Sequence, residues 1–410
     1  MRLKTIVKKN RISANLAHKA RAMRNTSRMK KYGRRLPIDP DKVVFYRAGG
    51  GYGDNPRAIA EYIHRHYPEM KLVWAYGAPE DRKTIPDYIH PVVFESEEYL
   101  REMSTAGAWV CSTILPSGTQ KREGQLYIQT WHGDKGFKKI ARDAGDLKNL
   151  KKGTSGRELM ESKICDYFLT GAQDFIPKIR SALGYEGEVI AHGLPRNDCL
   201  VNFDPEAARR IKENLHIPEP TKILIYAPTF RDHESKSGAV ASDIDLQAIL
   251  EAVEKKTGEP WMCLLKAHGR RKLNMAGSKN EKKFLDVTGY SDMADLLMIS
   301  DMLISDYSSC AGDFALTDHL ILLYQDDIDS YTSKDRTLYF DMKDTPFFVA
   351  HDLDEAVKII DQVTPEDIAE NCAAIRRFYG VCESGKASEE VVDLIMKNKD
   401  KLTKMDDSHG

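Results

Sequence analysis

The amino-acid sequence alternates short apolar runs with stretches of helical pattern, in two successive series. The first series begins at residue 43. Its apolar runs lie at 43–46, 72–75, 109–111, 126–129, 166–169 and 188–190, with helical stretches at 56–66, 97–104 and 174–183. Strands that are apolar along their whole length and alternate with helices are typical of a parallel sheet covered by helices on both faces. The sequence therefore predicts an α/β fold.

A break near residue 200 separates the two series. A helical segment opens at Asp204-Pro205, and the segment 217–220 then interrupts the chain with two prolines. Five further apolar runs follow, at 223–226, 262–265, 284–287, 302–304 and 320–323, and the tail from about residue 353 is helical in pattern. A chain of 410 residues exceeds the roughly 250–300 that one core accommodates. We therefore expect two doubly wound, Rossmann-like domains at 39–204 and 205–350, facing a central cleft, with a basic helical extension at 1–38 and C-terminal helices at 351–410.

The N-terminal extension is strongly basic. Residues 1–35 hold 13 Lys or Arg and no acid, whereas residues 36–410 have a formal net charge of −14. Its apolar residues recur every three to five positions, at Leu3, Ile6, Val7, Ile12, Leu16, Ala20 and Met23. A helix would gather many of these residues on one side between cations, which favours attachment to an anionic membrane surface. A helix packed on the body and a frayed cationic tail are the alternatives. Nucleic acid is disfavoured, because no base-reading or stacking module follows.

Composition places the chain among globular proteins. The 41% hydrophobic and 30% charged residues exclude collagen-like, disordered and disulfide-scaffold classes. The seven cysteines form no C-x-x-C pair, which indicates reduced thiols. No apolar run approaches the ~18–20 residues that span a bilayer, and no apolar segment of a signal peptide follows the basic N-terminus. These features predict a cytoplasmic protein that is peripheral at the inner face of the membrane.

Ligands of doubly wound sheets bind beyond the carboxyl ends of the strands, so the residues that follow each strand are the candidates for a site. The run at 126–129 ends in Thr130-Trp131-His132-Gly133 and a cationic stretch through Lys138 and Lys139. Histidine titrates near neutral pH, which makes His132 a candidate general base.

Two further candidates belong to the first domain. A loop with four glycines, 47–54, follows the first strand and includes Gly51, and Asn55 begins the next helix. This loop is either an acceptor-binding loop or simply a tight turn, and it lacks the G-x-G-x-x-G pattern of a nicotinamide or flavin site. The turn 193–198, with Arg196 and Asn197, either binds phosphate or organises the domain junction.

Three candidates belong to the second domain. The motifs 226–232 and 266–271 each follow an apolar strand and bring cations, as pyrophosphate recognition requires, although such cations can also be solvated loop charges. In the motif 304–315, Ser308 and Ser309 are expected to cap a helix and to receive phosphate oxygens. Asp306 and Asp313 are isolated acids, expected to orient neighbours or bind nucleoside, and no carboxylate cluster of a metal site is present.

Several of these motifs, taken together, resemble the CDP-glycerol glycerophosphotransferase family of teichoic-acid primases and polymerases. The resemblance covers roughly residues 40–380 and rests on Gln129–Gly133, Pro195–Asp198, Tyr226–Asp232, Asp306–Ser309, Asn55-Pro56 and Tyr339–Asp341. It implies a GT-B fold and transfer of glycerol phosphate from CDP-glycerol to a hydroxyl of a lipid-linked or polymer acceptor, with release of CMP and no cofactor or metal.

The resemblance also implies roles for the candidate residues. His132 and His268 are the expected catalytic residues. The expected donor site comprises Thr229, Arg231, His268, Asp306, Tyr307, Ser308, Ser309 and Asp313. The expected acceptor site comprises Gly51, Asn55, Lys138, Lys139, Arg196 and Asn197.

The chain departs from the family pattern after both histidines. His132-Gly133 continues as Asp134-Lys135 where the family commonly has Thr-Pro, and Lys266-Ala267-His268-Gly269 replaces a motif with Arg before and Pro after the histidine. The reaction type is retained, whereas the acceptor and the polyol are open, so a CDP-ribitol donor or a capsular polymer is an alternative. Two rivals are a nucleotide-sugar glycosyltransferase on the same fold and a non-catalytic membrane-surface binding protein.

Overall fold

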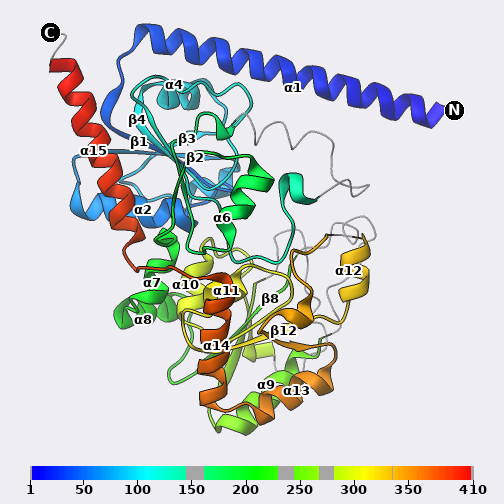
Figure 1. The fold of residues 1–410 in the computed structure, drawn as a ribbon. Coiled ribbons are helices and arrows are strands. Elements are labelled where there is room, and N and C mark those ends of the chain that lie inside the picture. The colour runs from blue at the N-terminus through cyan, green and yellow to red at the C-terminus, as the bar shows by residue number, and fades with distance from the viewer. Residues whose placement is uncertain (1, 145–160, 230–243, 267–280, 335, 408–410) are drawn as a thin grey trace.

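Two all-parallel sheets, one in each half of the chain, organise the structure, which is a computed structural model that describes residues 2–144, 161–229, 244–266, 281–334 and 336–407 (Figure 1). The first sheet has seven strands in the order β3-β2-β1-β4-β5-β6-β7. These strands are β1 (Asp39–Tyr46), β2 (Lys71–Tyr76), β3 (His90–Val93), β4 (Ala106–Cys111), β5 (Leu126–Gln129), β6 (Tyr167–Leu169) and β7 (Glu188–Ile190). The second sheet has six, in the order β10-β9-β8-β11-β12-β13. They are β8 (Lys222–Ala227), β9 (Trp261–Leu265), β10 (Phe284–Asp286), β11 (Met302–Ser305), β12 (Leu320–Tyr324) and β13 (Phe348–Ala350).

The eleven apolar runs predicted as strands all form strands, so the α/β fold with two Rossmann-like domains is confirmed. Two edge strands, β3 and β13, were not predicted, and Pro91 interrupts the apolar run of β3. Strand β4 is buried along its whole length, and β1 is buried at Val43, Val44 and Phe45, as expected for strands covered on both faces.

Helices cover both sheets. Those of the first half are α1 (Arg2–Arg35), α2 (Asp54–His66), α3 (Pro79–Arg82), α4 (Glu97–Thr105), α6 (Phe175–Lys178, continued by a π-turn at Ile179–Leu183) and α7 (Asp198–Val201). The second half contributes α8 (Pro205–Asn214), α9 (Leu246–Thr257), α10 (Met293–Met298), α11 (Cys310–Phe314) and α12 (Ile328–Lys334), followed by α13 (Leu353–Gln362), α14 (Pro365–Tyr379) and α15 (Ala387–Asp407). Short 3₁₀ turns occupy Ala141–Ala144, Pro195–Asn197, Glu281–Lys283 and Met342–Asp344. Local sequence sets these limits: Thr364 caps α14 in a capping box with Asp367, and Gly380, with φ 58°, ends it in the left-handed region.

The C-terminal helices divide between the two domains. Helix α13 packs on α9 and β13 of the second domain, whereas α15 returns to the first domain and packs on α2, β1 and β4 (Figure 1). Val391, Val392 and Ile395 of α15 are buried in the hydrophobic core of the first domain. The chain therefore crosses twice between the domains.

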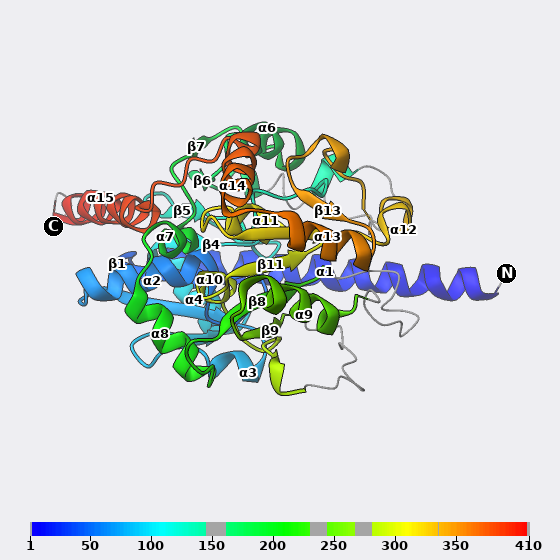
Figure 2. The same cartoon turned by 90° about the horizontal axis from the view of Figure 1, so that it is seen from below.

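Helix α1 packs on the first domain near its C-terminal end, against α4. Met29 is buried there, and Asn25 Nδ2 donates to Ser117 O at 3.3 Å. The N-terminal end of α1 projects beyond the two domains in both views (Figures 1 and 2). Within the described residues, no helix has both the length and the hydropathy needed to cross a bilayer.

In each sheet, successive strands are added on one side of the first strand and then, from one point on, on its other side. In the first sheet this point lies between β1 and β4, and in the second between β8 and β11. The loops that leave the carboxyl ends of such strand pairs diverge and open a crevice for ligands. In this chain, these loops are the glycine loop and the 112–115 segment of the first domain, and the 228–229 and 306–309 segments of the second.

Candidate active site between the two domains

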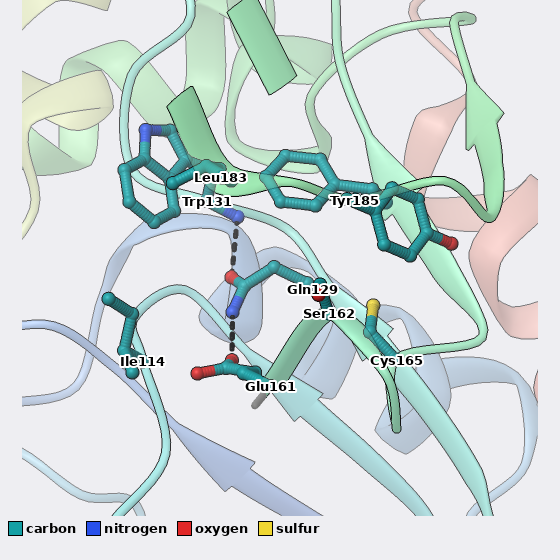
Figure 3. A pocket seen from close by; sticks show the side chains of 9 residues that line it. Ile114, Gln129, Trp131, Glu161, Ser162, Cys165, Leu183 and Tyr185 are labelled. Carbon is teal, nitrogen blue, oxygen red and sulfur yellow. Dashed lines mark hydrogen bonds between the residues drawn. The ribbon is translucent and has the colours of Figure 1, made fainter. Parts of the chain in front are cut away.

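The loop that carries His132 is held from several sides. Gln129 Oε1 accepts from Trp131 N at 2.9 Å, and Gln129 Nε2 donates to Glu161 Oε1 at 2.8 Å, as Figure 3 shows. Asn55, which is fully buried at the start of α2, donates to Trp131 O at 3.1 Å. Trp131 has a φ of 53°, a region that a large side chain rarely adopts. Such strain persists only where neighbours fix the backbone, and it occurs most often at functional sites.

The imidazole of His132 is oriented by a backbone carbonyl. Its Nδ1 lies 2.9 Å from Ser112 O, at the end of β4. Because a carbonyl oxygen only accepts, the neutral ring carries its proton on Nδ1 and the lone pair on Nε2. The side chain is accessible to solvent. Reduced solvation among the surrounding protein nevertheless lowers its pKa below the ordinary histidine value, against the opposing effect of the Ser112 carbonyl. His132 is thus neutral and basic at Nε2 near pH 7.

The His132 loop meets the serine motif of the second domain. A Cβ on Gly133 would overlap Ser309 Oγ, and a Cβ on Gly136 would lie 3.5 Å from Ser309 Cβ. A Cβ on Gly312 would in turn overlap the side chain of Lys135. Glycine at these three positions lets the two loops touch, and it brings Ser309 next to the residue that follows His132.

The other second-domain candidates support the serine loop from within. Both carboxylate oxygens of Asp306 accept from Thr229 N, at 2.9 and 3.0 Å, and so join the loops after β8 and β11. The Tyr307 ring is buried and stacks on Tyr331 with centroids 3.8 Å apart. Ser308 and Ser309 are partly exposed. A helix, α11, starts after Ser309 as predicted. The Ser309 hydroxyl makes no capping hydrogen bond, so the capping expected of it is wrong, whereas Ser308 Oγ accepts from Cys310 N, at the first residue of the helix, at 3.4 Å.

Arg196 connects the two domains beneath His132. Its Nη1 donates to His132 O at 2.9 Å and to Asp54 Oδ1 at 2.8 Å, and its Nη2 pairs with Asp313 Oδ2 at 2.8 Å. Burial alone would lower the pKa of Arg196, but the carboxylates of Asp313 and Asp54 raise it. Burial alone would raise the pKa of Asp313, but the positive charges of Arg196 and Lys135 lower it below its usual value. Both partners are therefore charged.

Beside this pair lies a second cluster, centred on Lys135. The ammonium group is fully buried and lies 2.6 Å from Glu383 Oε1, 3.0 Å from Asp134 Oδ1 and 3.1 Å from Asp313 Oδ1. Asn197 Nδ2 donates to Asp313 at 2.9 Å and to Glu383 at 2.7 Å. From the sequence, Lys135 was only part of the cationic stretch after His132 and one of the departures from the family motif. In the structure it fastens the His132 loop to α11 and to the segment that returns to the first domain.

The remaining predicted residues fall into three groups. Gly51 and Asn55 are buried in the first domain. Lys138 and Lys139 lie beside the second domain: Lys138 pairs in a bridge with Leu338, and Lys139 N donates to Thr337 O at 2.9 Å. Arg231 and His268 lie outside the described residues. The acceptor and donor roles of these residues stay predictions.

Behind Trp131 the first domain holds a small, mainly apolar pocket that is partly open to solvent (Figure 3). It is lined by Ile114, Gln129, Trp131, Glu161, Ser162, Cys165, Phe168, Leu183 and Tyr185. No group of three or more His, Cys, Asp or Glu side chains in the described ranges is arranged to hold a metal ion. All seven cysteines are free thiols, as predicted.

Comparison with known proteins identifies the family. Residues 28–397 match the family model described as CDP-Glycerol:Poly(glycerophosphate) glycerophosphotransferase. The chain belongs to this family. It is 32% identical over 377 residues to a teichoic acid poly(glycerol phosphate) polymerase of Staphylococcus epidermidis, covering 88% of this chain and 51% of that protein. It is 29% identical over 373 residues to a teichoic acid glycerol-phosphate transferase of Staphylococcus aureus, covering 87% and 94%.

Solved structures agree with this assignment. The fold matches a histidine-to-alanine variant of the wall teichoic acid polymerase TagF with a TM-score of 0.79 and 28% identity, over 96% of this chain and 99% of that one. A histidine-to-asparagine variant of TagF soaked with CDPG matches with a TM-score of 0.78 and 28% identity, over 97% and 99%. The chain spans about half the length of the two poly(glycerol phosphate) polymerases that it matches, 51% and 50%.

Several residues of the site were missed by sequence reasoning. Asp54 was noted only as a departure from a glycine pattern, and Asp134 and Lys135 only as departures from the family motif. Glu383 and Ser112 carry no local signal, because their partners are distant in the sequence.

Proposed function

We propose that this protein transfers glycerol phosphate from CDP-glycerol to a hydroxyl of a membrane-associated acceptor in the synthesis of a teichoic-acid or capsule-type polymer, with release of CMP. The observation that carries the proposal is the contact at Gly133, where the His132 loop of the first domain meets Ser309 of the second. The loop that carries His132 and the loop that carries Ser308 and Ser309 thereby meet at the carboxyl ends of both sheets. Membership of the glycerophosphotransferase family supports the same reaction.

The chemistry follows from charge and proton balance. The acceptor hydroxyl attacks the phosphorus that bears the glycerol, and a new P–O bond forms as the bond to CMP breaks. In our proposal the hydroxyl proton passes to His132 Nε2, the ring nitrogen that the Ser112 carbonyl leaves unprotonated. CMP departs as an anion, so it requires charge stabilisation more than protonation.

The donor phosphates are assigned to the second domain. Ser308 and Ser309 are partly exposed beside the domain contact, which suits hydrogen bonds to phosphate oxygens. Arg231 and His268 are proposed to add positive charge. Thr229, Asp306 and Tyr307 are proposed to position the serine loop rather than to touch the donor, since their side chains are buried among protein partners.

On the first-domain side, we propose that Arg196 positions His132 through its backbone carbonyl. Asn55 holds Trp131, the residue before His132, in the same way, by donating to its backbone oxygen. Asn197 and Asp313 extend this support, because each is buried and engaged with the Lys135 cluster. We therefore propose that these four residues, Asn55, Arg196, Asn197 and Asp313, position the site and do not touch the acceptor or the donor.

The test is turnover of CDP-glycerol with a soluble acceptor, measured as CMP and as a new phosphodiester. His132→Asn and His132→Ala are expected to lower kcat by about 10²–10⁴ while donor affinity stays near wild type. His90→Asn is the matched control, because His90 is exposed on β3 and bonded to Glu98. Near-normal turnover by His132→Ala, or loss of donor binding in it, would remove the assignment of the base.

Parallel reactions separate the alternatives. CDP-ribitol in place of CDP-glycerol tests the polyol, a glycoside product would indicate a nucleotide-sugar glycosyltransferase, and no turnover of either CDP-polyol would indicate a binding protein. The double variant Ser308→Ala with Ser309→Ala is expected to weaken donor binding roughly five- to a hundredfold, since each neutral hydrogen bond contributes about 0.5–1.5 kcal/mol. Calorimetry with wild-type donor affinity for this variant would remove the serines from the donor site.

We further propose that α1 attaches the protein to an anionic membrane surface on the cytoplasmic side. Leu16 and Met23 lie seven residues apart, about two helical turns, and are 62% and 67% exposed. Met29 lies on the opposite side of the helix and is buried against the body. An outward apolar pair among cations suits an interface with anionic lipid, and the free thiols suit a reducing compartment.

The membrane proposal is tested by vesicle sedimentation. Deleting residues 2–19 is expected to release the protein from vesicles that contain phosphatidylglycerol and to leave turnover of a soluble acceptor mostly intact. This deletion spares Asn25 and Met29, whose burial contributes to packing on the first domain. Unchanged vesicle binding after the deletion, at low and at moderate salt, would contradict the proposal.

A further inference from the structure

A buried carboxylate, that of Glu161, lies between the segments that follow β4 and β5. Glu161 is 8% exposed and lines the mainly apolar pocket behind Trp131 (Figure 3). A carboxylate loses its hydration when it is buried, so it is retained only where donors from the protein replace the water. The donors that surround Glu161 therefore show what this residue holds in place.

One oxygen of Glu161 acts on the segment after β5. Its Oε1 accepts from Gln129 Nε2 at 2.8 Å and from the Tyr127 hydroxyl, and Gln129 Oε1 accepts from Trp131 N at 2.9 Å (Figure 3). Because a carboxylate oxygen accepts and a backbone N–H donates, only one orientation of the Gln129 amide suits both neighbours. Glu161 thus fixes the side chain that holds Trp131, the residue before His132.

The other oxygen acts on the segment after β4. Leu115 N donates to Glu161 Oε2 at 2.9 Å, and the amide of Gln129 donates to Thr113 O at 3.2 Å. The residue just before Thr113 is Ser112, whose carbonyl lies 2.9 Å from His132 Nδ1. Glu161 therefore constrains the carbonyl that orients the His132 ring as well as the loop that bears the ring.

Trp131 makes the His132 loop dependent on this support. Its φ of 53° is unfavourable for a large side chain, and strain of this kind costs about 1–3 kcal/mol. Hydrogen bonds at both ends of the residue oppose the strain, from Trp131 N to Gln129 and from Asn55 to Trp131 O. Loss of the bond to Gln129 would let the backbone relax and would turn the residue that follows, His132.

We propose that Glu161 is a positioning residue for the transfer, which holds the His132 loop through Gln129 and the Ser112 carbonyl through Leu115. It thereby keeps Nε2 of His132 unprotonated and directed at the acceptor hydroxyl. This inference rests on the proposed function, in which His132 is the base. Glu161 acts through the protein and is assigned no contact with the acceptor or the donor.

Only a carboxylate suits both neighbours of this side chain. In Glu161→Gln, the side chain has one acceptor oxygen and one amide nitrogen that donates. With the oxygen toward Gln129 Nε2, the new amide nitrogen faces Leu115 N, and in the flipped orientation it faces Gln129 Nε2. Two donors meet in either case, so one of the two connections to His132 is lost.

Kinetics and histidine NMR on the full chain test the inference. Glu161→Gln is expected to lower kcat about 10- to 100-fold, as a small displacement of a reacting group does, and to leave the KM for CDP-glycerol within about twofold. At about pH 8 the ring of His132 is neutral. With ¹⁵N-labelled histidine, the signal that His132→Asn removes is expected to show the proton on Nδ1 in the wild type and shared between both nitrogens in Glu161→Gln.

Three variants complete the experiment. Glu102→Gln is the matched control, because Glu102 is a buried carboxylate that pairs with Lys42 at 2.7 Å, near the amino end of β1. The exchange of Glu161→Gln with Gln129→Glu sets a carboxylate opposite the new amide and is expected to recover part of kcat. Glu161→Asp keeps the charge but is one methylene too short to serve both sides. It is expected to fall between the wild type and Glu161→Gln, and it preserves the test if Glu161→Gln is unstable.

Three results would overturn the inference: wild-type kcat with an unchanged His132 signal in Glu161→Gln, a loss of kcat that Glu102→Gln matches at the same loss of melting temperature, and a raised KM for CDP-glycerol with kcat unchanged. The proposed reaction fails separately. Absence of CMP release by the wild-type protein, with a His132 signal that still depends on Glu161, would count against the reaction and leave the positioning role standing.

Discussion

The buried ammonium of Lys135 provides the sharpest test of how the two domains are held. Lys135→Met removes the cation and keeps most of the side-chain volume. It leaves Glu383, Asp134 and Asp313 facing a site from which their shared partner, 2.6–3.1 Å away, has gone. Together with Arg196 and Asp54, the cluster would change from two cations and four acids to one cation and four acids.

The expected loss can be stated as a free energy. Removing one partner of a buried ionic cluster costs about 3–5 kcal/mol, a large part of the ~5–15 kcal/mol that stabilises a folded protein. At roughly 2–4 °C per kcal/mol for a domain of about 150–250 residues, the melting temperature should fall by about 6–20 °C. The loss should be smaller at pH 5 than at pH 8. Burial already raises the pKa of Glu383, and without the opposing ammonium it rises further, so that protonation at low pH removes the excess negative charge.

Scanning calorimetry of four proteins checks this reasoning. The double variant Lys135→Met with Glu383→Gln restores the original charge balance and should recover about 1–3 kcal/mol relative to Lys135→Met alone. Lys397→Met, at an exposed position on α15, should change stability by no more than about 0.5 kcal/mol. A Lys135→Met protein as stable as Lys397→Met, or one that Glu383→Gln destabilises further, would refute this role of Lys135.

Three further predictions concern the site itself. Gly133→Ala should lower kcat at least tenfold with a melting temperature close to wild type, because its Cβ would push the Ser309 loop from the His132 loop; wild-type turnover would show that this contact is not needed. The acidic limb of the kcat/KM profile should lie below the ordinary histidine value of about 6.5, since activity is lost when the lowered pKa of His132 is passed on the way down; a limb that survives His132→Asn would belong to another group. Arg196→Met should reduce kcat more than it raises the KM for CDP-glycerol, as measured by CMP release, because it frees the His132 backbone.

The sequence was sufficient for the strands and for His132, because both leave local patterns. Short, continuously apolar runs that alternate with helical stretches predicted β1, β4, β8 and β11, and a histidine at a strand end pointed to the crevice between the domains. The edge strand β3 was missed because Pro91 interrupts its apolar run.

What the sequence could not give were the pairings between distant segments. Lys135 lies among glycines and lysines, which give no sign of its burial, yet three carboxylates, from residues as far away as Glu383, compensate that burial. Asp313 and Asn197 read as ligand-binding residues, and in the structure they serve the same cluster. Pairings of this kind depend on which loops the two sheets bring together, and a single sequence does not state that.

The return of α15 has a consequence for how the chain acquires its structure. Asn398 Nδ2 donates to the carbonyls of Gly107 and Gly124, both at 3.1 Å, and Val391, Val392 and Ile395 fill the same core as Phe45 of β1. The first domain therefore has an unfinished interior until residues 391–398 have been made. Contacts across more than 270 residues form slowly, because the ends of a long loop must be brought together first. During synthesis, the first sheet would expose apolar surface while the second domain, complete up to α14, can already fold. Fragments that end before residue 387 should consequently yield an aggregation-prone first domain, although every strand of its sheet is present.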